Sequence, residues 1–308
     1  MDCGTEMMMK TRTLLVAASL AATLGGAAPA FAQEHGAPHP PRQSWAFSGV
    51  FGTFDRAQLQ RGFKVYREVC QSCHALQIPF RTLAQNGGPQ FSTGQVQALA
   101  AEYKVKDGPN DAGEMFERPG RAADVIPPPF PNENAAAAAN GGKAPPALQL
   151  LAKARTYERG FPWFVFDAMP FLQYQEHGPD YIHAILNGYK EPPADVTVPA
   201  GGNYNEYFPG HVIAMPKPLS DGQVEYPKAA DGKPQAPETV DQYARDIAAF
   251  MMWTAEPTME QRKSTGFKVI IFLFVFAFLL SYVKKKIWAR VGGEAEGAAG
   301  QAPLGPTG

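Results

Sequence analysis

Two long apolar stretches lie near the two ends of a chain whose middle is polar and rich in turn-forming residues. The first runs from Leu14 to Ala28 and follows the positive charges of Lys10 and Arg12. With the A-x-A sequence at 30–32, this order of charge, apolar stretch and small residues is typical of a secretory signal peptide. A retained membrane anchor fits less well, because the stretch is short and ends in a cleavage site. We therefore expect residues 1–32 to be removed on export.

The second apolar stretch, from Phe267 to Val283, is almost uninterrupted and long enough to cross a bilayer. A buried core helix of this length would rarely be apolar on all of its faces. Lysines follow directly at 284–286, and the positive-inside rule places such a cluster in the cytoplasm. We expect one anchor over 262–286 in the bacterial inner membrane, with the preceding domain in the periplasm. A disordered cytoplasmic tail is expected over 287–308.

Between these stretches, apolar residues at helical spacing predict two main helices. The first begins after Asp55, which can cap its N-terminus, and keeps apolar side chains on one face as far as Cys70. The second begins after Thr239, also a capping residue, and continues to Trp253. Pro257 then separates it from the membrane anchor. The sequence thus indicates a mainly α-helical domain.

Long loops are expected between these helices, because the chain contains 30 glycines and 29 prolines. Shorter helices are predicted at 148–155 and 180–186, and the alanine run at 135–139 is compatible with another. The segments 107–146 and 189–237 are predicted to be loops, the second with room for a small hairpin. Residues 189–237 show no strong helical or strand periodicity.

Charge and cysteine content narrow the possible chemistry. The net charge of the 308 residues is −1, which gives no indication of nucleic-acid binding. Of the three cysteines, Cys3 lies in the expected signal peptide. The mature chain therefore keeps only Cys70 and Cys73, and if both serve one chemical site no structural disulfide is possible.

These two cysteines belong to the sequence Cys70-Gln71-Ser72-Cys73-His74, the attachment pattern of a c-type haem. Each thiol can add to one vinyl group of the porphyrin, and the adjacent histidine can then bind the iron. A thioredoxin-like dithiol would need a βαβ context, which the sequence does not indicate. A zinc site would need a second pair of ligands. We predict one covalent haem c, with His74 as an axial ligand.

A pure electron-transfer haem needs a second axial ligand, and methionine in that position raises the reduction potential. The candidates beyond the signal region are Met115, Met169, Met215, Met251, Met252 and Met259. Met251 and Met252 lie on a predicted helix and are most simply core residues, whereas Met169 and Met215 both precede proline in loops. Local sequence does not choose between those two. A bis-histidine site using His177, His183 or His211 also stays open.

From Thr53 to Arg290 the chain resembles the cytochrome c1 family, the haem-c subunit of quinol:cytochrome c reductase, the cytochrome bc1 complex. The resemblance is carried by several long motifs in the right order. They are the haem motif followed by FRTL at 80–83, KDGPNDAGEMFERPGR at 106–121, AANGG at 138–142, GPDYIHAILNGYKEPP at 178–193, NYNEYFPGHVIAMPKPL at 203–219, and AEP at 255–257 before the membrane span.

The resemblance implies that Met215, in IAMPKPL, is the sixth iron ligand. It also implies a class I cytochrome c-like core with long loop insertions, here assigned to residues 53–258 after an N-terminal extension at 33–52. The implied partners are the cytochrome b subunit, the Rieske iron–sulfur subunit, a cytochrome c or equivalent acceptor, and the lipid bilayer. No nucleic-acid partner is implied.

The chain departs from the family pattern at Ala137 and Ala147, in the proline run at 127–129 and in the aromatic stretch at 161–171. Ala137 stands where the family usually has an arginine expected near a haem propionate, and Ala147 replaces an aspartate. The family's docking of cytochrome c uses acidic surface, and the matching motifs contain acidic residues that are candidates for this role; an ordinary solvated face is the alternative interpretation. These are Asp107, Asp111, Glu114 and Glu117.

The interpretation that follows is an electron-transfer subunit, which receives electrons from the Rieske protein and passes them to a cytochrome c. The single chain would transfer electrons only, as one part of a quinol–cytochrome-c reductase. The main alternative is a membrane-tethered carrier cytochrome with no stable partner. A gas-binding haem sensor is a further alternative, which would require an open sixth position.

Overall fold

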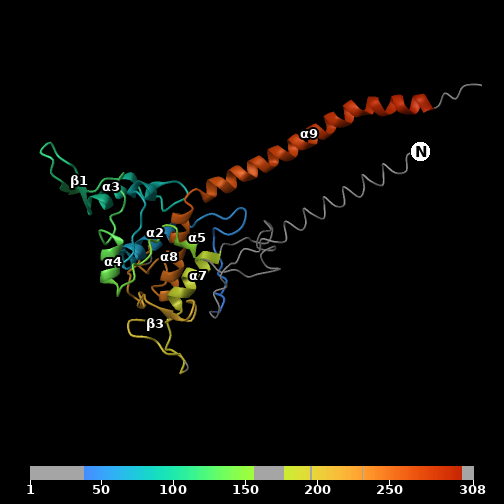
Figure 1. Cartoon of the computed structure of the whole chain (residues 1–308). Helices are drawn as coiled ribbons and strands as arrows, with labels where there is room; N and C mark the ends of the chain where they lie inside the picture. The colour runs from blue at the N-terminus through green and yellow to red at the C-terminus, as the bar shows by residue number, and fades with distance from the viewer. Residues whose placement is uncertain (1–37, 156–176, 195, 231, 300–308) are drawn as a thin grey trace, which may run out of the picture. The chain divides into compact units, whose positions relative to one another are not determined.

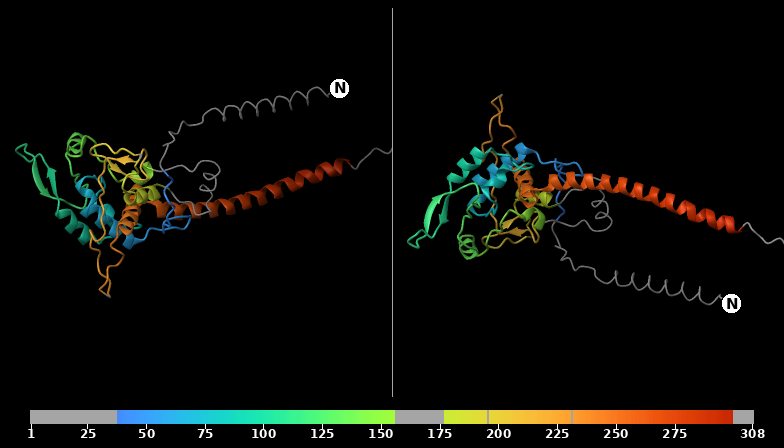
Figure 2. Two further views of the ribbon diagram at one scale, coloured as in Figure 1. Left: turned by 90° about the horizontal axis from the view of Figure 1, so that it is seen from below. Right: turned by 90° about the horizontal axis from the view of Figure 1, so that it is seen from above.

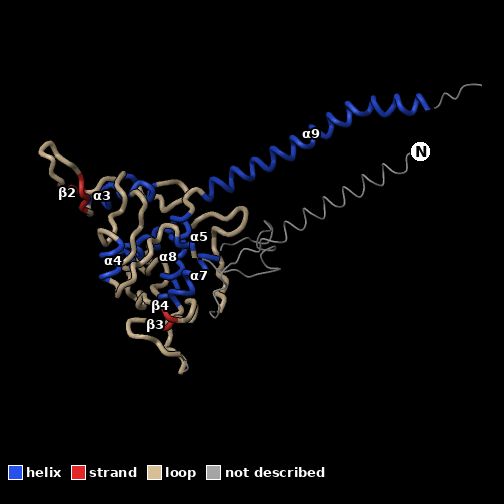
Figure 3. The backbone as a smooth tube through the Cα atoms, viewed as in Figure 1, coloured by secondary structure: helices blue, strands red, loops and turns tan. Residues whose placement is uncertain are grey.

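The computed structural model describes residues 38–155, 177–194, 196–230 and 232–299. The expected signal peptide, at residues 1–32, and Met169 lie outside these ranges. Within them the fold is mainly helical, as predicted, and ends in a long apolar helix (Figures 1 and 3). The helices are α2 (Arg56–Glu68), α3 (Thr93–Ala101), α4 (Glu133–Ala139), α5 (Leu151–Ala154), α7 (His177–Asn187), α8 (Val240–Ala255) and α9 (Met259–Ala299), with 3-10 helices η1 (Cys70–Ser72) and η2 (Phe80–Ala84).

Helix α8 forms the middle of the core, where it packs against α2, α7 and α5 (Figure 2). Both helices that the apolar spacing predicted are present, and their caps form as expected. The Asp55 carboxylate accepts hydrogen bonds from the backbone N–H groups of Ala57 and Gln58 at the start of α2. The Thr239 hydroxyl accepts one from Gln242 at the start of α8. These caps satisfy N–H groups that the first helical turn leaves without partners.

Helices α2 and α8 cross in direct contact at Gly62. A β-carbon at this position would lie 2.2 Å from the Asp246 carbonyl oxygen and 2.6 Å from Cβ of Phe250. Only glycine therefore allows the two backbones to approach this closely. Around the crossing, the aromatic rings of Phe63 and Phe250 pack with centroids 5.7 Å apart.

A buried charged group joins the two helices beside this crossing. The carboxylate of Asp246 on α8 is completely buried and accepts two hydrogen bonds from Arg61 on α2, at 2.8 and 3.1 Å. It also accepts hydrogen bonds from Tyr226 Oη and Gln242 Nε2, both at 2.8 Å. Because a buried carboxylate is costly unless its oxygens are fully bonded, these donors together make its burial tolerable.

The segment preceding α2 packs onto the same core. Trp45 is buried, and its indole N–H donates to Asp180 on α7 at 2.8 Å. The guanidinium of Arg245 on α8 lies 5.7 Å from the centroid of the Trp45 ring. The described part of the N-terminal extension is therefore part of the folded domain.

The region predicted to be a loop at 107–146 contains regular structure, so that prediction was wrong in part. Strands β1 (Lys104–Asp107) and β2 (Phe116–Pro119) form an antiparallel hairpin. Most of its side chains are exposed, so no apolar alternation marked the strands. Arg118 stabilises the hairpin by bonding to both Asp107 and Asp124, and it lowers the pKa of both carboxyl groups.

Two further elements compare differently with the sequence analysis, which missed one helix and predicted one hairpin. Helix α3 was not predicted, although Ser92 and Gln95 form a reciprocal capping box at its start. A short pairing of β3 (Asn203–Tyr204) with β4 (Val212–Ile213) confirms the small hairpin expected within 189–237.

Helix α9 begins after the break at Pro257, as predicted. Its segment Met259–Ala289 is long and apolar enough to cross a membrane, with a mean hydropathy of 2.4 in its most apolar window. The helix continues to Ala299. Residues 287–299, which the sequence analysis placed in a disordered tail at 287–308, are helical in the structure.

Replacing Gly62 by alanine tests the helix crossing. We expect the Gly62→Ala variant to lose about 1–3 kcal/mol of unfolding free energy, because the new methyl group must displace backbone and core atoms. Gly94→Ala in α3 is the matched control, since a β-carbon there meets nothing within 4 Å. Chemical denaturation of the haem-loaded proteins measures both, and equal midpoints for the two variants would contradict the close approach.

Candidate haem site

The haem motif lies where α2 gives way to a tighter 3-10 turn. Helix α2 ends at Glu68, and η1 covers Cys70–Ser72. The backbone N–H groups of Cys73 and His74 both donate to the Cys70 carbonyl, at 3.2 and 2.9 Å. This turn folds the five residues into a compact group, so that both thiols and the imidazole belong to one short segment.

The imidazole of His74 is oriented by the backbone. Its Nδ1 lies 2.8 Å from the carbonyl oxygen of Pro146. A carbonyl can only accept a hydrogen bond, so Nδ1 carries the proton and Nε2 keeps its lone pair. Burial lowers the pKa of His74, an effect that the hydrogen bond to Pro146 partly opposes. The ring is thus held neutral, which is the form that binds a metal.

Pro146 is itself held in place by pairing between two distant segments. The N–H of Leu148 donates to the Ala75 carbonyl at 2.9 Å, and the N–H of Gln77 donates to Oε1 of Gln149 at 3.3 Å. The chain around 146–149 therefore runs beside the residues that follow His74. Sequence reasoning missed this contact, because a main-chain acceptor leaves no signal in residue identity.

The surroundings of the cysteines argue against the two rival chemistries. Burial raises the pKa of the Cys70 thiol to about 12, whereas a redox-active dithiol needs a lowered thiol pKa. Among the described residues, no group of three or more His, Cys, Asp or Glu side chains is arranged to hold a metal ion. Neither a dithiol catalyst nor a zinc site is supported.

Met215 lies in the loop that follows β4, and its backbone is fixed from two sides. The hydroxyl of Tyr189 donates to the Met215 carbonyl at 3.0 Å, and Nδ2 of Asn203 donates to the same oxygen at 3.3 Å. The Met215 side chain itself is half-buried. Tyr189 and Asn203 also line a surface hollow of about 570 Å³ next to this loop.

The other candidate ligands in the described part of the chain have different surroundings. Met251, Met252 and Met259 are buried in the hydrophobic core, and Met115 is 63% exposed on the β1–β2 hairpin. His183 is buried and its Nε2 lies 2.8 Å from an oxygen of Asp241. His177 lies beside Asp180 on α7, and His211 stacks on Tyr204.

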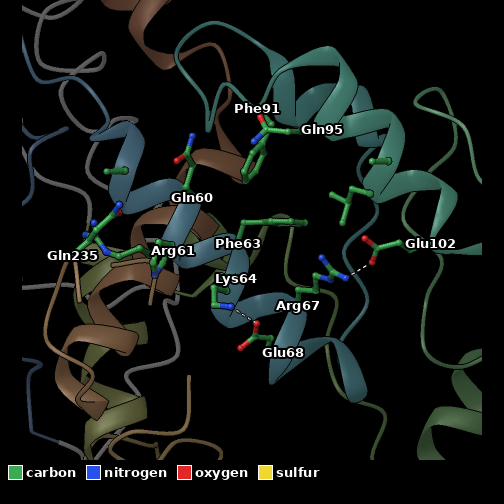
Figure 4. A pocket seen from close by; sticks show the side chains of 14 residues that line it. Gln60, Arg61, Phe63, Lys64, Arg67, Glu68, Phe91, Gln95, Glu102 and Gln235 are labelled. Carbon is green, nitrogen blue, oxygen red and sulfur yellow. Dashed lines mark hydrogen bonds and ion pairs between the residues drawn. The ribbon is translucent and has the colours of Figure 1, made fainter. Parts of the chain in front are cut away.

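A separate groove of about 470 Å³ lies between α2 and α3 (Figure 4). It contains none of the residues predicted to bind haem. Its charged side chains pair with one another, as Lys64 does with Glu68 and Arg67 with Glu102. None of the residues lining the groove belongs to the haem motif, which begins at Cys70, just after α2 ends.

Known proteins resemble this chain over most of its length. Residues 45–291 match the model of the Cytochrome C1 family. The chain is 58% identical over 288 residues to a protein named cytochrome b/c1 from Bradyrhizobium diazoefficiens, covering 93% of this chain but only 40% of that relative. It is 47% identical to a cytochrome c1 from Blastochloris viridis and 40% identical to one from Rhodospirillum rubrum. These alignments cover 91% and 90% of this chain, and 98% and 96% of the relatives.

Proposed function

This chain belongs to the cytochrome c1 family, and from that premise we propose how its residues hold the family's haem c and serve electron transfer in a bc1 complex. Cys70 and Cys73 are the points of covalent attachment, each adding its S–H across one vinyl group to form a thioether. His74 and Met215 are the side chains that would bind the iron. The haem supplies one-electron chemistry, with the iron alternating between the ferric and ferrous states.

The orientation of His74 carries this proposal. A ligand histidine usually donates its second ring N–H to a carbonyl or carboxylate, which fixes the tautomer and the plane of the ring. The contact from Nδ1 to Pro146 provides this arrangement and leaves Nε2 for the iron. The same contact would have no purpose in a dithiol or a zinc site built from the two cysteines alone.

A haem iron with a protein ligand on each side is suited to electron transfer. With His74 and Met215 bound, no position on the iron is open to a substrate or gas, and a methionine ligand raises the reduction potential. The paired hydrogen bonds to the Met215 carbonyl restrict the loop that would present the methionine sulfur to the iron.

The proposed partners of this chain rest on the family and on the name of one relative. The Bradyrhizobium relative is named cytochrome b/c1, and this chain matches only part of its length. That name supports association of this chain with a cytochrome b subunit. We propose a Rieske iron–sulfur subunit as the electron donor and a cytochrome c as the acceptor, with α9 anchoring the haem domain on the periplasmic side of the inner membrane.

The β1–β2 hairpin is the proposed docking element for that cytochrome c. Asp111, Glu114 and Glu117 are exposed on it, while Asp107 is engaged by Arg118. Exposed carboxylates of this kind act by steering a basic partner during encounter. The structure thus leaves three of the four acidic residues available for steering.

A membrane-tethered carrier cytochrome with no stable partner is the second candidate. Visible spectra of the protein, after gentle purification from its own membrane, distinguish the complex subunit from the tethered carrier. Co-purification of b-type with c-type haem supports the complex subunit, while c-type haem alone favours the carrier.

Replacing Met215 by leucine tests the sixth ligand. We expect the ferrous Met215→Leu protein to bind carbon monoxide readily, and its reduction potential to fall by on the order of 0.1 V or more, within the roughly 0.8 V that axial ligands span. Met115→Leu is the control, because Met115 is exposed on the hairpin. Unchanged spectra and potential in Met215→Leu would exclude this methionine as the ligand.

Tyr189→Phe and Asn203→Ala test the support of the Met215 loop. Each removes one hydrogen bond worth about 1 kcal/mol, so added imidazole should displace the methionine about fivefold more readily. Tyr243→Phe is the control, since its hydroxyl donates to the Val224 carbonyl at 2.7 Å in the core. The control should lose stability without changing displacement; the same change in all three variants would indicate general loosening.

Neutralising the exposed acids tests the docking element. A variant with Asp111→Asn, Glu114→Gln and Glu117→Gln should reduce cytochrome c more slowly at low salt and show a weaker dependence of the rate on ionic strength. Glu133→Gln in α4 serves as the single-charge control. A salt profile identical to that of the unmodified protein would remove the hairpin from docking.

A further inference from the structure

A short loop at 47–54, before α2, is hydrogen-bonded to the first turns of α9. The Lys263 ammonium on α9 donates to the carbonyl oxygens of Phe47 and Gly52, at 2.6 and 3.1 Å. The backbone N–H of Phe54 donates to Oε1 of Glu260 at 2.7 Å. Two side chains of α9 thus hold the two sides of the loop at 47–54.

The loop is closed and tightly folded. The N–H of Thr53 donates to the Ala46 carbonyl, and the N–H of Ser48 donates to the Trp45 carbonyl, both at 3.1 Å. A β-carbon on Gly52 would lie 2.1 Å from the Ser48 carbonyl oxygen, so this residue must be glycine. Because Trp45 at the base is buried, the tip of the loop is presented by a defined structure.

Phe51 is at this tip, and its side chain is 76% exposed. Its ring makes an edge-to-face contact with Phe267, with centroids 5.4 Å apart. Phe267 opens the apolar run of α9, whose side chains are themselves largely exposed. A large aromatic side chain held in water by a rigid loop is unfavourable unless another phase or molecule covers it.

We propose that Phe51 inserts into the lipid interface, so that the loop at 47–54 is a second membrane contact beside α9. This inference rests on α9 being the membrane anchor proposed above. Lipid is the occupant that the contacts favour, because Phe51 continues the apolar surface of the span through Phe267. Lys263, one turn earlier on α9, is a cation of the kind that marks a membrane interface.

Nitroxide labels test this placement in the haem-loaded protein, held within its complex in phosphatidylcholine nanodiscs. Three single variants carry the label, namely Phe51→Cys, Leu279→Cys within the span and Met115→Cys on the hairpin, each with Cys3→Ser. Collision with oxygen, which concentrates in lipid, is compared with collision with a water-soluble nickel chelate. An unchanged visible spectrum of each variant shows that the haem domain is intact.

We expect the oxygen-to-nickel collision ratio at Phe51 to resemble that at Leu279 and to exceed that at Met115 several-fold. A ratio at Phe51 equal to that at Met115 would place the loop in water and overturn the proposal. Low collision with both reagents would show that another protein subunit covers Phe51, which also overturns it. Chelate access at Leu279 would instead remove the anchor itself, so failure of the two proposals is distinguishable.

Discussion

The close crossing of α2 and α8 is the contact on which the haem motif depends. Gly62 lets the helices meet, and the buried ion pair between Arg61 and Asp246 fixes their register. A slip along the crossing would expose the Asp246 carboxylate to an apolar core without its donors, which is strongly unfavourable. Because the motif follows directly on the last turn of α2, this crossing also determines where the cysteines and His74 lie.

The features that could be predicted from sequence are those with a strong local signal. Helical spacing and caps identified α2 and α8, and continuous apolarity identified α9. The CxxCH spacing identified His74 as a ligand candidate without any structure. Helix α3 also carried a readable signal in its Ser92–Gln95 capping box, which was overlooked.

Other features depended on contacts between distant segments and left little trace in the sequence. Most side chains of the β1–β2 hairpin are exposed and none on its strands is fully buried, so its strands show no clear apolar alternation, and Arg118 holds it through charges rather than through a core. Residue types alone did not choose between Met169 and Met215; the family resemblance did. The hydrogen bonds from Tyr189 and Asn203 join residues that are 26 and 12 positions away from Met215.

The hydrogen bond from His74 to Pro146 has a consequence for how this protein tolerates mutation. Its acceptor is a main-chain carbonyl, which no side-chain substitution can delete. Neighbouring positions are therefore free to carry different side chains as long as the path of the chain is kept. Ala147, which replaces an aspartate of the family pattern, illustrates that freedom. The proposed iron ligand is thus oriented by a group that every amino acid carries, whatever its side chain.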